Sequence, residues 1–177
     1  MIAARRILSI ILALGAWLSA ALGLGLTSHV SAATPELMVD YVKVSFDQLA
    51  GFKVTPPPFD PNAKPGSEGP SLGAQIPDAI RGLDGRKAIV TGFMLPIKME
   101  GGRVTELLLM RSQMMCCYGV VPQVNEWILV RMAKGTTQLM DVPVSFGGLL
   151  HVKELYENGF LTAIYTLDGE KMLPTKS

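Results

Sequence analysis

The sequence predicts a mainly β fold over residues 76–177, a small five-stranded barrel of the OB type with one or two short helices. Beyond Ile76 the chain consists of short apolar runs separated by turn residues, which is typical of strands. Glycines lie inside two of these runs, where they indicate bulges or bends that curve a sheet. Five runs in about 100 residues fit such a barrel. Half of a β-sandwich, or an open sheet with a packed helix, is the alternative architecture.

Five ranges are predicted as strands: 87–96, 104–111, 126–132, 142–152 and 160–167. Gly92 lies inside the first, and Gly147 and Gly148 lie inside the fourth. The glycines at 101 and 102 predict a hairpin between the first two strands. Residues 153–159 combine helix-forming residues with a final glycine, which predicts a short helix, and Asp168 with Gly169 predicts a turn.

Two further segments precede this domain. Residues 34–52 mix apolar and polar side chains and fit either a short helix or an extended segment. Residues 53–73 are rich in proline and glycine, a composition that disfavours helix and central strand alike. We therefore expect residues 34–75 to form an N-terminal segment and a Pro/Gly-rich linker or arm, and residues 77–81 to form one helical turn.

The first 33 residues are predicted to be a secretory signal peptide. Arg5 and Arg6 give a positive start, residues 7–26 carry no charge, and residues 30–33 offer the small side chains of a leader-peptidase site. The apolar stretch is also long enough to span a bilayer, so a retained N-terminal membrane anchor is the alternative. Both interpretations predict a periplasmic or otherwise exported bacterial protein in an oxidising compartment.

The charge of the chain excludes partners chosen by bulk electrostatics. Beyond the leader, fourteen of the 16 Lys and Arg face all 15 Asp and Glu, so the remaining chain is nearly neutral. It has no basic tract and no alternation of basic and aromatic residues, so we expect no nucleic-acid binding.

The adjacent cysteines Cys116 and Cys117 are the leading candidates for chemistry. A trans peptide sets neighbouring Cα atoms about 3.8 Å apart, whereas relaxed disulfides prefer about 4.4–6.8 Å, so a disulfide between them would be strained and easily reduced. Reduced, the pair offers two thiolates to Cu(I) or Zn(II). Both alternatives need a turn here, because adjacent side chains of a strand point to opposite faces. In the third interpretation the two cysteines are separately buried, small apolar residues.

His151 is the one histidine beyond the leader, and histidine is a favoured ligand of zinc and copper. We consider it either a third metal ligand beside Cys116 and Cys117 or a hydrogen-bonded structural residue. Tyr118, Gln123, Asn125, Glu126 and Trp127 follow the cysteines and complete a candidate binding loop. In the alternative, Asn125 shapes a turn, Glu126 is solvated and Trp127 belongs to the core.

Two motifs carry a resemblance to a known family: Cys-Cys-Tyr-Gly at 116–119 and Pro-Gln-Val-Asn-Glu-Trp at 122–127. With the runs at 76–85, 92–96 and 107–113, the chain resembles an uncharacterised family of bacterial exported proteins with a domain of unknown function. The resemblance spans residues 75–170 or so and implies no activity. As context it implies metal-uptake or ABC-transport components as partners.

These observations predict an exported, non-enzymatic binding or accessory module that handles a soft metal, copper or zinc, or a protein partner through the loop at 116–127. One alternative is a thiol-redox protein with a vicinal disulfide, and another is a structural or assembly protein of the envelope. We assign no catalytic residue and lean against an enzyme, because the phosphate-loop, His-Glu-x-x-His and Cys-x-x-Cys motifs are missing.

Overall fold

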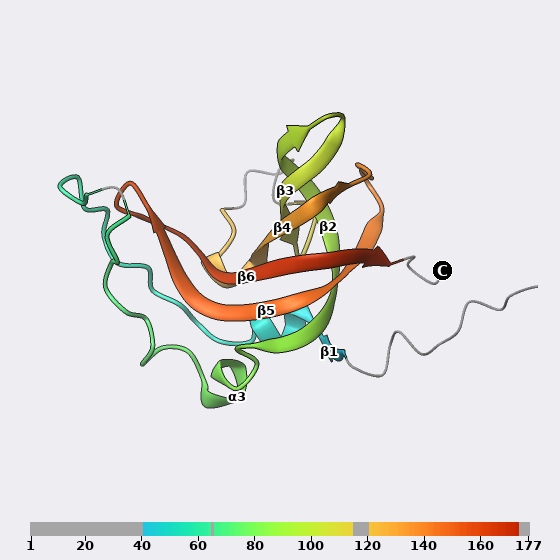
Figure 1. The fold of residues 1–177 in the computed structure, drawn as a ribbon. Helices are drawn as coiled ribbons and strands as arrows, with labels where there is room; N and C mark the ends of the chain where they lie inside the picture. The colour runs from blue at the N-terminus through green and yellow to red at the C-terminus, as the bar shows by residue number, and fades with distance from the viewer. Residues whose placement is uncertain (1–40, 65, 115–120, 174–177) are drawn as a thin grey trace, which may run out of the picture. The chain divides into compact units, whose positions relative to one another are not determined.

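A computed structural model of the chain describes residues 41–64, 66–114 and 121–173 (Figure 1). The signal peptide or anchor predicted at 1–33 lies outside these residues, as do Cys116, Cys117 and Tyr118. Within them, no helix is both long and apolar enough to cross a membrane.

Over the residues that the structure describes, the fold is mainly β with short α-helices, as the sequence predicts. Its elements in chain order are β1 (Val42–Val44), α2 (Phe46–Leu49), α3 (Asp78–Arg81), β2 (Arg86–Glu100), β3 (Arg103–Met110), the 3-10 helix η2 (Val124–Glu126), β4 (Trp127–Thr136), β5 (Pro143–Glu157) and β6 (Phe160–Leu173). The strands form a six-stranded sheet in the order β1-β2-β3-β4-β6-β5. The sixth strand, β1, comes from the segment at 34–52 whose structure the sequence leaves open.

β2 has two antiparallel partners along its length, besides its short parallel pairing with β1. Its first half pairs antiparallel with β5, from Arg86 to Phe93, and its second half pairs antiparallel with β3, from Phe93 to Glu100. The exchange occurs beside Gly92, where a Cβ atom would lie 2.6 Å from the carbonyl oxygen of Met110. Glycine therefore permits the close approach of β3 at the point where β2 changes partner.

The helix predicted at 153–159 is wrong, because β5 continues through these residues to Glu157 and pairs with β6, Tyr156 opposite Leu161. The connection is Asn158 and Gly159, with φ of 51° and 81°. Asn-Gly between two strands is among the strongest hairpin signals, since both residues tolerate positive φ. The turn predicted at Asp168 and Gly169 is also wrong, because both residues lie inside β6 and pair with residues of β4 and β5.

The segment before the arm contributes to the core. Ser45 caps α2 by accepting a hydrogen bond from the backbone N–H of Gln48, and the Gln48 side chain accepts one from Ser45 in return. This cap directs Phe46 and Leu49 inward, where both are buried. The Tyr165 hydroxyl, on β6, donates to the Leu49 carbonyl at 2.9 Å, so α2 is fixed against the sheet by packing and by a buried hydrogen bond.

Candidate functional site

Residues 111–126 connect β3 to β4 and contain the first sequence motif and all of the second but its last residue, Trp127. The described parts of this connection are residues 111–114 and 121–126, which flank the cysteine pair on both sides. These flanks determine how firmly the cysteine-containing segment is attached to the sheet.

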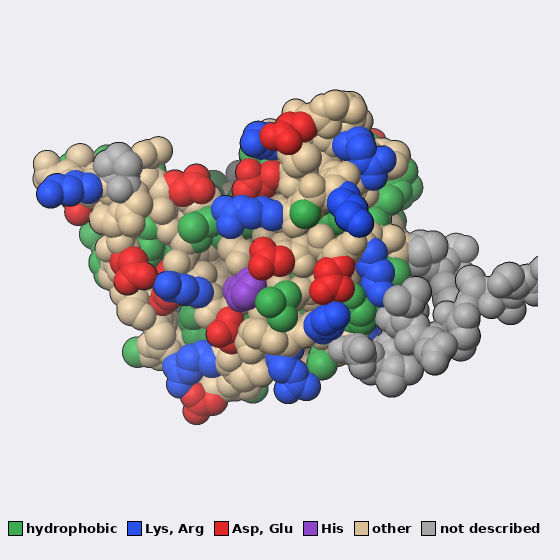
Figure 2. Space-filling model, viewed as in Figure 1, with side chains coloured by type: hydrophobic (Ala, Val, Ile, Leu, Met, Phe, Trp, Pro, Cys, Tyr) green, Lys and Arg blue, Asp and Glu red, His purple; other side chains and the backbone are tan. Residues whose placement is uncertain are grey.

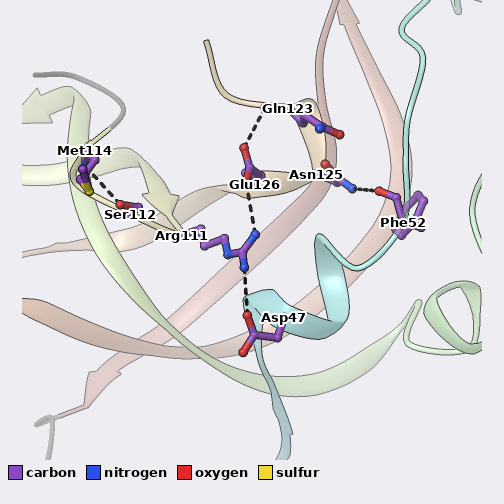
Figure 3. Close-up of polar contacts among 8 residues, drawn as sticks. All are labelled: Asp47, Phe52, Arg111, Ser112, Met114, Gln123, Asn125 and Glu126. Carbon is purple, nitrogen blue, oxygen red and sulfur yellow. Dashed lines mark hydrogen bonds and ion pairs between the residues drawn. The ribbon is translucent and has the colours of Figure 1, made fainter. Parts of the chain in front are cut away.

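The two ends of this connection are held together at its base (Figure 3). The last pair of the β3–β4 ladder is Met110 opposite Trp127, and the Arg111 N–H donates to the Glu126 carbonyl at 3.0 Å one step further. The Arg111 guanidinium lies between two carboxylates, 3.4 Å from Glu126 and 3.1 Å from Asp47 of α2. One cation thus joins both ends of the connection to the N-terminal helix.

Glu126 is committed to this base. Its second carboxylate oxygen accepts the Gln123 N–H at 2.9 Å, while its own N–H donates to the Gln123 carbonyl at 2.9 Å. The side chain therefore stabilises the η2 turn and pairs with Arg111. The interpretation of Glu126 as a solvated residue does not fit this arrangement, and the structure gives it a positioning role at the start of β4.

Among the described residues of the connection, Asn125 is the most deeply buried polar one, with 0% of its surface exposed. Its Nδ2 donates to the Phe52 carbonyl at 2.7 Å, which ties η2 to the segment after α2. Its Oδ1 is buried and has no hydrogen-bond partner among the residues that the structure describes. Trp127 is half-buried against the core, and its indole N–H donates to the Thr162 carbonyl at 3.1 Å.

Exposed apolar side chains lie close to this connection. The Gln113 amide donates to Asp141 at 3.1 Å, which brings the connection beside the β4–β5 turn. Four exposed residues flank this hydrogen bond in sequence, and we call them the apolar rim: Met114, Leu139, Met140 and Val142. Asp141 itself has φ of 61°, a left-handed conformation that is uncommon outside glycine and here turns the chain between two rim residues.

The structure places His151 on β5 between two carboxylates (Figure 2). Its Nε2 lies 3.0 Å from Asp168, and its Nδ1 lies 4.0 Å from Asp84. Asp84 also accepts the Val152 N–H at 2.8 Å. The hydrogen bond to Asp168 fits the structural interpretation of His151. Among the residues that the structure describes, no three His, Cys, Asp or Glu are grouped as metal ligands.

An open cavity of about 710 Å³ lies over β4 and β6, and sequence reasoning does not find it. Its charged side chains are already paired: Lys98 with Glu100 at 2.7 Å, and Arg131 with Glu106 at 3.1 Å. Asp168, which also lines it, contacts His151. The alternating charges on this face (Figure 2) come from separate strands, so only the strand order reveals the cluster.

Comparison with known proteins identifies a family but no activity. The model of a family described as a protein of unknown function, DUF3299, matches residues 72–174. A crystal structure of a DUF3299 family protein from Pseudomonas aeruginosa PAO1 is similar to 77% of this chain and 97% of its own, with a TM-score of 0.55 and 21% sequence identity. This likeness concerns the fold. No curated protein matches the chain in sequence.

Proposed function

The chain belongs to the DUF3299 family of proteins of unknown function, and we propose a function for it. It is an exported, non-enzymatic accessory module that binds a soft metal ion, Cu(I) or Zn(II), through Cys116 and Cys117. The attached base at Arg111 and Glu126 is the single observation that carries the proposal. These contacts support an interpretation in which residues 111–126 form a binding loop whose two ends are fixed to a rigid β-sheet.

The support is inferred to be an OB-like barrel. β2 pairs with β3 and β5, β3 with β4, and β4 with β6, which in turn pairs with β5, so the pairings of these five strands form a closed ring. The β4–β6 pair is parallel and the others are antiparallel. This order is consistent with a Greek-key barrel, in which β1 is an added strand beside β2.

A metal site on this loop draws mainly on the cysteine pair. Thiolates are the preferred protein ligands of Cu(I) and good ligands of Zn(II). His151 is held between Asp84 and Asp168, so we no longer assign it as the third ligand. Met114 is exposed two residues before Cys116 and offers a thioether, which favours Cu(I) over Zn(II).

The apolar rim supports a protein partner as the route by which metal arrives or leaves. Met114, Leu139, Met140 and Val142 are exposed on both sides of the Gln113–Asp141 hydrogen bond. Clustered exposed apolar side chains commonly mark interaction sites. A component of an envelope metal-transport system that buries this rim would receive the metal from the thiolates of Cys116 and Cys117, which follow Met114 in the sequence.

The test is a Cu(I) titration of the reduced full chain, in a mild detergent, against a chromophoric Cu(I) chelator. We expect about one equivalent to be withdrawn from the chelator, and the double variant Cys116→Ser/Cys117→Ser to lose this binding. His151→Gln is the matched control and should bind as the unchanged chain does. Equal Cu(I) uptake by the double cysteine variant would remove the proposal.

A thiol-redox function is the second candidate, because the strain of a vicinal disulfide makes it easy to reduce. It predicts a two-electron reduction potential well above that of structural disulfides. Finding both thiols free in protein taken from its native compartment would count against it.

A further inference from the structure

The proline-rich arm lies beside the turn end of the β5–β6 hairpin (Figure 1). Residues of the arm and of the hairpin line a cavity. Lys153 contacts Glu68 at 3.0 Å, the Tyr156 hydroxyl donates to the Pro70 carbonyl at 2.6 Å, and the Asp60 N–H donates to the Gly159 carbonyl at 3.3 Å. These contacts lie at the turn end of the hairpin, at residues 153–159. The cavity between arm and hairpin measures about 360 Å³, within the range of small-ligand sites, roughly 300–1,000 Å³.

Two glycines allow the arm and the hairpin to approach each other closely. Gly69 lies on the ring of Tyr156 so closely that a Cβ atom there would overlap the ring. Gly159, with φ of 81°, lies under the Asp60 carbonyl, where a Cβ atom would overlap the oxygen. Other residues at these positions would push the arm away from the hairpin.

The cavity is lined by proline and aromatic rings and by two carboxylates. Its lining includes three prolines and two aromatic side chains: Pro57, Pro58, Pro70, Phe59 and Tyr156. Phe59 stacks on Phe160 with centroids 4.1 Å apart, which fixes one wall while 48% of Phe59 stays exposed. Asp60 and Glu68 also line the cavity, and none of its described lining residues is a lysine or arginine.

Both carboxylates have capacity for another donor. Asp60 uses Oδ1 to accept the Asn62 N–H at 2.9 Å, and Glu68 uses Oε1 to pair with Lys153. A carboxylate has two oxygens and about four acceptor positions, so each retains room for a cation. The Lys153–Glu68 pair is exposed, with 71% and 84% of the two side chains accessible, and such a pair exchanges easily with a competing cation.

We propose that this cavity binds an organic cation with an apolar stem, an alkylguanidinium or alkylammonium group. The stem fits among the proline and aromatic rings, the charge lies near Asp60 and Glu68, and the aromatic faces add cation–π attraction. The group is carried by a free amine or by an arginine or lysine side chain of a peptide. This site does not depend on Cys116 and Cys117, so it goes beyond the function proposed above.

The test is a titration of the ¹⁵N-labelled full chain, in mild detergent, with n-butylguanidinium, followed by amide chemical shifts. We expect saturable shifts confined to residues 57–70 and 153–160, and at least tenfold weaker binding of the neutral isostere n-butylurea. Equal binding of the urea, or shifts concentrated elsewhere, would overturn the proposal. A blocked Gly-Arg-Gly peptide distinguishes the sources: tighter binding than butylguanidinium assigns the site to a peptide, and weaker binding assigns it to a free amine.

Variants separate charge from folding. Asp60→Asn/Glu68→Gln should weaken butylguanidinium at least threefold, and Lys153→Gln should tighten it by freeing Glu68. Glu100→Gln, whose partner is Lys98 outside this cavity, is the charge-matched control and should bind unchanged. Unaltered affinity in the double variant, with an unchanged Tm, would contradict a role of these carboxylates.

Discussion

Asn125 shows at the scale of a single residue how the candidate loop is attached to the rest of the chain. Its amide donates to Phe52, while its own oxygen is buried without a partner among the described residues. A buried polar group without a hydrogen bond costs free energy, so the bond to Phe52 is the compensating interaction. The sequence indicates a turn at Asn125, but only the structure shows that its side chain joins two distant segments.

We expect Asn125→Ala to lower the free energy of unfolding by about 1–3 kcal/mol, because the Phe52 carbonyl loses its donor. Urea denaturation followed by tryptophan fluorescence measures the loss. The exposed Asn62→Ala is the matched control and should change stability by less than about 0.5 kcal/mol. An equal effect of the two substitutions would show that the buried bond contributes nothing.

Tyr165 predicts how stability depends on alkaline pH. Burial raises the pKa of its phenol above the ordinary 10.0, so the folded chain keeps the proton that the unfolded chain loses. The resulting stability is fully present below pH 10 and falls as the pH rises above it. We expect Tyr165→Phe to cost about 1 kcal/mol at pH 7, because the bond to Leu49 is lost.

The same substitution should flatten the alkaline decline, measured as urea unfolding at pH 7, 9 and 10.5. Tyr156, whose pKa is raised by burial and then by Glu154, leaves a smaller slope in the variant. Parallel curves for the two proteins would contradict the assignment of the decline to Tyr165.

At the scale of elements, the sequence predicts strands where apolar runs are separated by turn residues, as at the hairpin glycines 101–102, and it places Gly92 inside the first of these strands. It fails at 153–159, where helix-forming residues lie in a strand because β6 supplies the pairing. Propensity is a weak guide where tertiary pairing is available, and Asn158 with Gly159 was the local signal for the hairpin. No local sequence pattern predicts that the arm contacts this hairpin.

Gly159→Ala tests the attachment of the arm. We expect a loss of more than about 2 kcal/mol, because positive φ costs an alanine about 1–2 kcal/mol and the Cβ also overlaps the Asp60 carbonyl. Gly102→Ala, with φ of 76° and open space around its Cβ, isolates the conformational cost. Thermal unfolding and amide exchange of residues 57–70 report the difference, and identical losses would show that the arm does not depend on this contact.

Arg111→Met tests the base of the candidate loop. Its ion pairs are partly exposed, so we expect a stability loss below about 1 kcal/mol but faster amide exchange at residues 112–114 and 121–126. Arg131→Met, which removes a comparable pair with Glu106, is the control and should leave exchange at the loop unchanged. Unaltered exchange in Arg111→Met would show that the loop is held by other contacts.

At the scale of the whole molecule, composition predicts a mainly β fold but not the order of the strands. The parallel β4–β6 pair and the return of β5 to β2 join residues far apart in sequence, and no periodicity encodes such partners. The same limit applies to function. The sequence singles out Cys116 and Cys117, whereas the cavity beside the arm and the carboxylates around His151 come from several elements at once.

Native mass spectrometry of the reduced full chain after Cu(I) loading, with and without thiol alkylation, tests the metal-binding account most directly. The account predicts a species that retains one copper ion and whose two thiols resist alkylation until the metal is removed. Alkylation of both cysteines at the same rate with and without Cu(I), and a mass without copper, would contradict it.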